Sequence, residues 1–222
     1  MKLIKNMATF NLTNTKATAV TRIQPWTISE VQFKGVEERS GNTKDGGVWK
    51  AIQLKFAGAN GTFEPMFFCP KEDGDQRVSG ETAGRKWELP SAVEQLQFAI
   101  AHIVGTLAPA NFSKLQNVSV ELPKDFSKLV DLVKKATASA VNKTTNIKVI
   151  GDNKGYAAVP NFININKEGA AYISNNWVGD NLAFSAYELK KKDAQTNAKP
   201  TAVDDVAPES TEDANEDLDF DI

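Results

Sequence analysis

The chain has little of the residues from which most catalytic and metal sites are built. Its 222 residues include one cysteine, Cys69, and one histidine, His102. A single cysteine excludes an internal disulfide and fits a reducing compartment. One Cys and one His are too few for the usual ligand set of a zinc site, and no context joins them as a nucleophile and its base. We expect His102 to be a structural residue of a helix and Cys69 a small, half-buried strand residue.

Long apolar runs and nucleotide-binding motifs are also lacking. No apolar run reaches the roughly 18 residues of a membrane span, and the first residues lack the apolar region of a secretory signal. The cytoplasm is therefore the expected compartment. Walker A, G-x-G-x-x-G, H-E-x-x-H and G-x-S-x-G motifs are all missing, which favours a binding protein without a cofactor over an enzyme. Acids in "KEDGD" (71–75) could hold Mg²⁺ in a nuclease-like site, although solvated loop acids are the favoured interpretation.

Basic residues are absent from the end of the chain. After Lys199 there is no Lys or Arg, but nine acids follow. Removing those nine from the 28 acids leaves 19 against 26 bases, so residues 1–199 carry about +7 (26 − 19). We expect a folded, basic domain over 1–192. An acidic tail over 193–222 has few large apolar groups and is expected to be disordered.

Alternating apolar and polar residues predict strands in the first third of the chain. "WTISEVQFKGVEE" (26–38) and "VWKAIQLKF" (48–56) have this pattern, and Asn60-Gly61 forms a hairpin signal before "FEPMFFCP" (63–70). These segments predict a meander of three antiparallel strands. The next stretch, 71–90, is expected to be a long polar loop that ends in a cluster of bases around Trp87.

The hydrophobic period then changes from strand to helix. Ser91 followed by Glu94 is a capping box, and apolar residues at helical spacing continue until Pro109. A second helix is predicted over 125–141. Strands are expected again in 146–165, and "GAAYISNNW" and "NLAFSAYELKKK" complete the body. This order predicts a β-rich α+β protein, an antiparallel OB-like barrel or sheet of about five strands with a two-helix insertion at about 91–141.

Bases lie next to aromatic residues at several points of the predicted body. Cations neutralise phosphates, and flat rings stack on unpaired bases for roughly 1–3 kcal/mol each. Trp49 and Lys55 are expected to point away from the apolar face formed by Val48, Ile52, Leu54 and Phe56. The competing interpretation is that strand aromatics belong to the core. The candidate nucleic-acid-binding residues are Lys34, Trp49, Lys50, Lys55, Arg85, Lys86, Trp87, Lys154 and Tyr156.

The acidic segment ends in "EDLDFDI", which resembles the C-terminal tip of the single-stranded DNA-binding proteins of bacteria and phages. The resemblance implies an OB-like body whose acidic tail competes with DNA and recruits partner proteins. The residues that would do so are Asp217, Asp219, Phe220, Asp221 and Ile222. The common bacterial ending closes with Pro-Phe, whereas Phe220 is here followed by two residues, and this difference favours a phage replication protein.

The leading hypothesis is a non-enzymatic protein that binds single-stranded DNA without strong sequence preference during replication or recombination. Its partners would be replication or recombination proteins, with no membrane involved, and a homo-oligomer is compatible with this role. RNA stays open as a ligand. The alternative is a protein-interaction or virion component whose exposed aromatics are interface anchors. A Mg²⁺-dependent nuclease is the third hypothesis.

Overall fold

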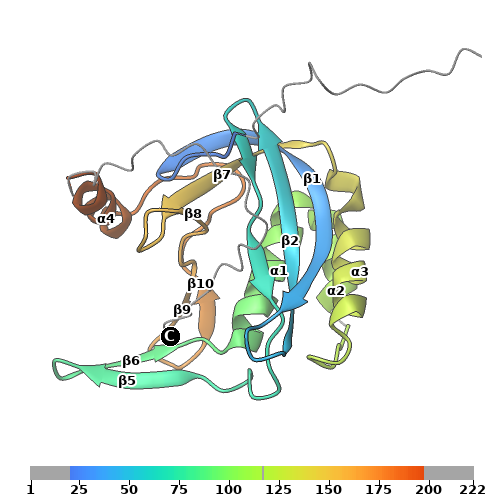
Figure 1. Cartoon of the computed structure of the whole chain (residues 1–222), viewed down its shortest axis with the longest axis horizontal. Helices are drawn as coiled ribbons and strands as arrows, with labels where there is room; N and C mark the ends of the chain where they lie inside the picture. The colour runs from blue at the N-terminus through green and yellow to red at the C-terminus, as the bar shows by residue number, and fades with distance from the viewer. Residues whose placement is uncertain (1–20, 117, 198–222) are drawn as a thin grey trace, which may run out of the picture.

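The computed structural model describes residues 21–116 and 118–197. It is a β-rich α+β protein whose main sheet is antiparallel, strongly curved and nearly closed into a barrel (Figure 1). The sheet follows the order β3-β2-β1-β7-β8, and β4 pairs with β2. The predicted fold class is therefore confirmed at this level. The strands are β1 (Thr27–Asn42), β2 (Val48–Gly58), β3 (Gly61–Phe63), β4 (Met66–Phe68), β7 (Thr144–Gly151) and β8 (Ala157–Ala158).

Strand β1 bends at a β-bulge that contains Lys34. The register moves from Phe33↔Phe56 to Gly35↔Lys55, so Lys34 is the extra residue. Gly35 has φ 118°, a conformation that glycine adopts without the strain of a side chain. The extra residue reverses the inward alternation, because Val31 and Phe33 are buried before the bulge and Val36 after it. One long strand can thus keep its apolar side on the core while the sheet curves.

Strand β2 confirms most of its predicted apolar face. Ile52, Leu54 and Phe56 are buried, but Val48 is 67% exposed because it lies at the start of the strand, beyond the core. The third predicted strand is divided into β3 and β4 around Pro65, whose carbonyl accepts a hydrogen bond from the Leu54 amide. The meander was predicted correctly, and of the four residues of the predicted apolar face only Val48 is exposed.

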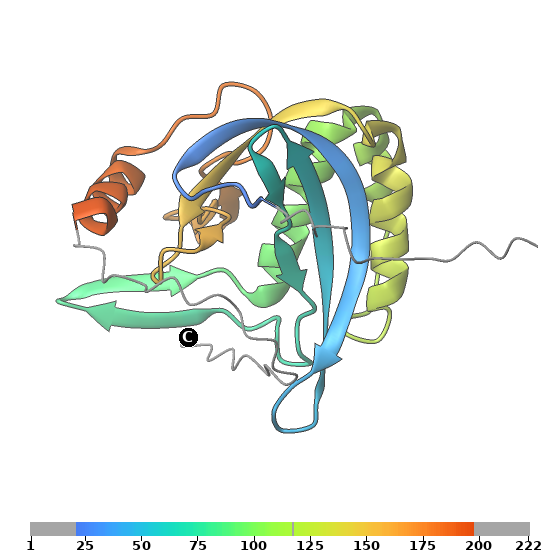
Figure 2. The same cartoon turned by 45° about the horizontal axis from the view of Figure 1, so that its top comes forward.

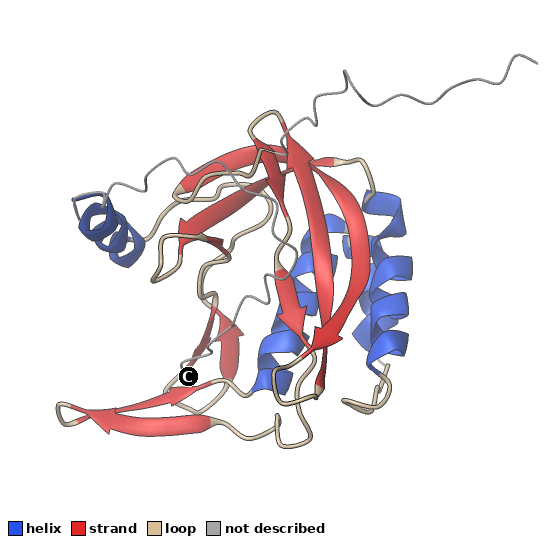
Figure 3. Cartoon of the chain, in the orientation of Figure 1, coloured by secondary structure: helices blue, strands red, loops and turns tan. Residues whose placement is uncertain are grey.

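Three helices, not two, follow the meander (Figure 3). They are α1 (Ala92–Leu107), α2 (Pro109–Gln116) and α3 (Phe126–Thr137). Helices α1 and α3 pack against the sheet, and α2 packs against these two helices. The capping box at the start of α1 is complete, since Ser91 accepts from the Glu94 amide and Glu94 accepts from the Ser91 amide. Helix α2 was missed because Pro109 begins it. Proline suits the first position of a helix as well as the residues after one.

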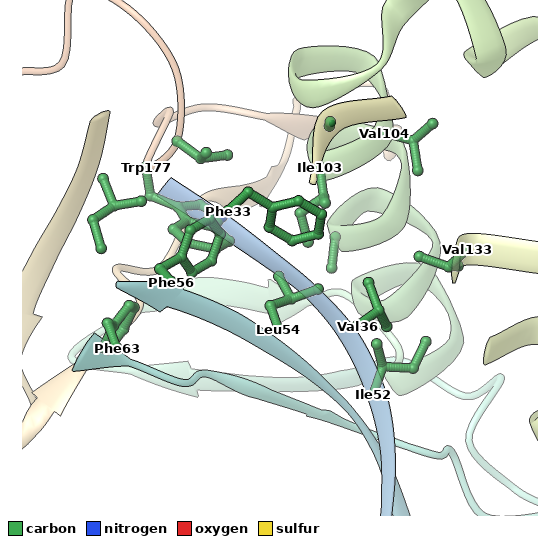
Figure 4. Close-up of a cluster of buried hydrophobic side chains, with 14 of the residues drawn as sticks. Phe33, Val36, Ile52, Leu54, Phe56, Phe63, Ile103, Val104, Val133 and Trp177 are labelled. Atoms are coloured by element: carbon green, nitrogen blue, oxygen red, sulfur yellow. The ribbon is translucent and has the colours of Figure 1, made fainter. Parts of the chain in front are cut away.

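The core lies between the inner face of the sheet and helices α1 and α3 (Figure 4). Phe33 and Phe56 pack with ring centroids 5.5 Å apart, and Trp177 meets Phe56 edge-on at 6.0 Å. Trp177 is completely buried, although its indole N–H has no hydrogen-bond partner within the described residues. These aromatic contacts join the meander to the second half of the chain.

A two-stranded arm, β5 (Val78–Thr82) and β6 (Arg85–Leu89), projects from this body (Figures 1 and 2). The prediction of a long polar loop over 71–90 was therefore wrong for its second half. Ala83 and Gly84 connect the strands with φ values of 50° and 73°, the positive values of the turn that best matches strand twist. Beside the arm lies a second small hairpin, β9 (Ile163–Ile165) and β10 (Ala171–Ile173).

The last described element is a helix, α4 (Ala186–Asn197), which was not predicted from the sequence. Ser185 and Glu188 form its capping box, because each accepts a hydrogen bond from the other's amide. Glu188 also binds the fully buried Lys148 of β7 at 3.1 Å. The helix crosses residue 192, so ordered structure runs past the boundary expected for the tail. Of the helices in 21–116 and 118–197, none has the length and apolar character needed to span a membrane.

Candidate nucleic-acid interface

Trp87 lies on the arm with one ring face covered and 41% of its surface exposed. It stands opposite Gly80 in the β5–β6 register, and a Cβ atom at Gly80 would overlap the indole ring. The indole Nε1 donates a hydrogen bond to Thr82 Oγ1 at 3.0 Å. Glycine and threonine therefore hold the ring flat against the hairpin, and its uncovered face is available for stacking.

The arm and the β9–β10 hairpin together line an open groove of about 640 Å³. Trp87 and Lys86 come from β6, and Tyr172, which is 44% exposed, comes from β10. Asn164 and Asn166 also line the groove, so it combines two aromatic rings with hydrogen-bonding groups. Such a combination suits unpaired bases, whose faces stack and whose edges accept and donate hydrogen bonds.

The base of the arm is fixed by Arg77. Its guanidinium binds both carboxylate oxygens of Glu94 at the start of α1, Glu88 on β6 at 3.4 Å, and the Gly169 carbonyl at 2.7 Å. The Arg77 hydrogen bond, opposed by partial burial, lowers the pKa of Glu94 to about 2. One side chain thus joins the arm, helix α1 and the β9–β10 turn, which sets the width of the groove.

The charge of the groove is balanced rather than strongly basic. Arg85 and Lys86 have no ion pair with any described residue, but Glu81 and Glu88 lie on the same arm. The described residues carry 22 bases and 19 acids, a net charge of +3 (22 − 19). The net charge of +7 expected for residues 1–199 includes four more bases, three in 1–20 and Lys199, which lie outside the described residues.

Two of the β2 candidates, Trp49 and Lys55, lie on the outer face of the sheet, whereas Lys50 points to the helix side, where its Nζ lies 3.5 Å from Ser127 Oγ of α3. Trp49 is half-buried, covers Gly41 of β1, and packs edge-on against Phe68 at 5.7 Å. Lys55 pairs with Glu37 at 2.6 Å, and Lys50 lies 3.8 Å from Glu38. The prediction that Trp49 and Lys55 point away from the core is correct. The cations of Lys55 and Lys50 are nevertheless each neutralised by a neighbouring acid, so β2 is a weaker candidate than the arm.

The other candidates lie apart from both groups. Lys34 occupies the β1 bulge and donates to Gln32 and Asn142. Lys154 and Tyr156 belong to the β7–β8 turn, where both backbone amides donate to Asp152 at 2.8 Å. The Tyr156 ring is 69% exposed. Among the described residues, no hydrogen bond, ion pair or ring contact joins these positions to the groove beside the arm.

Of the residues considered for catalysis, His102 and Cys69 are buried or half-buried among core side chains. His102 is buried between Phe162 and Trp177, and burial lowers its pKa to about 4. Cys69 is half-buried, and burial raises its pKa. The described ranges contain no group of three or more His, Cys, Asp and Glu side chains that could hold a metal ion, including the acids of 71–75. The tail residues Asp217, Asp219, Phe220, Asp221 and Ile222 lie outside the described residues.

Comparison of the chain with protein-family models, with curated proteins and with solved structures gives no match. The site is therefore interpreted from its own geometry.

Sequence reasoning found Lys86 and Trp87 but missed Tyr172, which lines the same groove. A signal was present, because the apolar Ala171 and Ile173 flank Tyr172, and strand alternation would place the Tyr172 side chain on the opposite, outward face.

Proposed function

We propose that this protein binds single-stranded DNA without strong sequence preference, as a non-enzymatic protein of replication or recombination. The observation that supports this most is the pair of exposed rings, Trp87 and Tyr172, on two separate hairpins across one groove. Two stacking surfaces with free cations beside them would hold successive bases of an unpaired strand. A duplex keeps its bases stacked on each other and offers no such partner.

We further propose that the curved sheet is an OB-like barrel. In support, the sheet is antiparallel, its longest strand β1 pairs with both β2 and β7, and the helices enter between the meander and β7. This is the place where OB-type barrels often carry their helix. The acidic segment would then compete with DNA for the basic groups and recruit partner proteins through Asp217, Asp219, Phe220, Asp221 and Ile222, as in phage proteins of this kind.

The test is a salt titration of affinity for oligo-dT and for a duplex of equal length. We expect oligo-dT to bind more tightly and its affinity to fall with added salt. Replacing Trp87 or Tyr172 with Ala should each weaken oligo-dT binding about tenfold, the loss of one stacked base. Tyr187→Ala is the matched control, because Tyr187 is 77% exposed on α4 outside the groove. Equal affinity for both ligands, or full affinity in both groove variants, would refute the proposal.

One observation favours the alternative of a protein-interaction or virion component. Val78 and Leu89 on the arm are 47% and 45% exposed, and with Trp87 they form an apolar strip. Apolar residues of this kind can anchor a protein interface. Analytical ultracentrifugation separates the two functions, since self-association that depends on Val78 and Leu89 but is unaffected by oligo-dT would support the alternative.

A further inference from the structure

A second surface of the molecule is an apolar groove between the three helices. It has a volume of about 320 Å³ and lies between α1, α2, α3 and the segment that connects α2 to α3. Ten of the twelve lining residues are apolar, and most of these are half-buried. Six of them are Ile100, Phe112, Leu115, Val120, Leu129 and Leu132.

Basic residues outnumber acids in the part of the chain that forms α2 and α3. Residues 109–137 contain five lysines and three acids, a net charge of +2 (5 − 3). Two of the acids are already paired, Glu121 with Lys124 at 3.6 Å and Asp131 with Lys134 at 4.0 Å. Lys128 and Lys135 have no ion pair with any described residue. They lie four residues before and three residues after Leu132, so the helix places both beside this lining residue.

The residues 216–222 have the composition that such a groove requires. In "EDLDFDI", Leu218, Phe220 and Ile222 alternate with Asp217, Asp219 and Asp221. In an extended conformation, alternation of this kind would put three apolar side chains on one side and the acids on the other. The first side matches the apolar floor of the groove, and the acids match the lysines at its rim.

The distance that the chain can span and its charge both favour residues 216–222 over residues 1–20 as the occupant of the groove. Twenty-five residues separate Asn197 from Ile222. At about 3.3 Å per residue they can extend roughly 80 Å, which exceeds the width of a domain of this size. Residues 1–20 also contain apolar side chains, but their charged residues are three lysines and no acid, so a basic rim repels them.

We infer that the segment 216–222 docks into the groove between α1, α2 and α3 of its own chain, with Phe220 and neighbouring apolar side chains inside and the acids toward Lys128 and Lys135. This inference does not depend on DNA binding. It gives the partner-binding residues a place on the protein itself, from which a partner would have to remove them.

A spin label near the segment tests the inference in the full chain. The label is attached at Ala214→Cys in a Cys69→Ser background, and methyl groups are observed by NMR without nucleic acid. We expect broadening of the methyls of Ile100, Leu115 and Leu132. Phe220→Ala should lower the docked population about tenfold, whereas the matched control Val206→Ala in the same acidic segment should leave the broadening intact.

Three other outcomes would overturn the inference. One is broadening confined to Val78, Leu89 and Ile165, which would place the segment at the arm. Another is broadening that appears only when spin-labelled molecules are mixed with separate, isotope-labelled molecules, which would show that the segment of one molecule docks into the groove of another. The third is no broadening at all.

Charge reversal at the rim gives an independent readout. Lys128→Glu with Lys135→Glu should abolish the broadening, whereas the same change at Lys143 and Lys167, exposed lysines elsewhere on the body, should not. Equal loss in both double variants would show only general attraction between an acidic segment and a basic protein, and would also overturn the inference. Failure of these tests leaves the oligo-dT measurements untouched.

Discussion

At the scale of single residues, His102 links folding to pH. The side chain is 7% exposed and lies against Phe162 and Trp177, and burial lowers its pKa from 6.5 to about 4. The unfolded chain therefore takes up a proton near pH 6.5, while the folded chain does not until about pH 4. The stability from this residue is complete above pH 6.5. It falls as the pH drops through this window, by up to about 3 kcal/mol.

Urea unfolding between about pH 7.5 and 5 measures this effect. His102→Gln keeps a hydrogen-bond acceptor near the Trp177 amide, which lies 3.5 Å from His102 Nε2. It removes the only histidine of the chain, so the free energy of unfolding should become nearly independent of pH in this range. An unchanged slope in the variant would show that another group is responsible.

Gly80 decides the position of the Trp87 ring. A Cβ atom there would overlap the indole, so Gly80→Val should displace the ring and weaken oligo-dT binding about tenfold, as the loss of one stacked base would. Near-UV circular dichroism reports the displacement. Gly105→Ala in α1 is the matched control, because a Cβ at Gly105 meets no atom within 4 Å. It should raise stability by roughly 0.5–1 kcal/mol and leave binding unchanged.

At the scale of elements, the arm is the part of the body that folding needs least. Among the described residues, the buried core contains none from β5 or β6. Of the ten strand residues of the arm, nine are exposed and only Gly80 is half-buried. Replacing residues 78–89 with a short Gly/Ser linker should leave the thermal midpoint within a few degrees of the wild type. It should nevertheless abolish the preference for single strands. A large loss of stability would mean that the arm supports the core.

Which elements could be predicted depends on whether their evidence is local. The capping box of α1 and the alternation of β2 are local patterns, and both were predicted correctly. The arm was missed because its strands are exposed on both faces, so no apolar alternation marks them. Helix α4 was missed because Glu188 is stabilised by Lys148, 40 positions earlier in the chain. The placement of Trp87 and Tyr172 on two hairpins beside one groove is likewise a long-range relation that no local pattern contains.

At the scale of the whole molecule, the contrast between a basic body and an acidic segment gives a test by truncation. Removing residues 203–222 deletes nine acids and no base. If these acids compete for the cationic groups, the truncated protein should bind oligo-dT more tightly at low salt, and the difference should disappear as salt rises. It should also lose its protein partners in pull-down experiments. Weaker binding by the truncated protein would contradict the competitor role.

The buried pair of Lys148 and Glu188 has a mechanical consequence. Lys148 Nζ also binds Asn175 and the Ala183 carbonyl, and at the other end of α4 Gln195 accepts a hydrogen bond from the Trp26 indole at 2.9 Å. Separating a buried charge from its partner costs several kcal/mol. A protein that pulls on the chain beyond Asn197 therefore pulls on a fastened helix. The tension would pass to β7 and, through the β7–β1 ladder, to the central strand of the barrel.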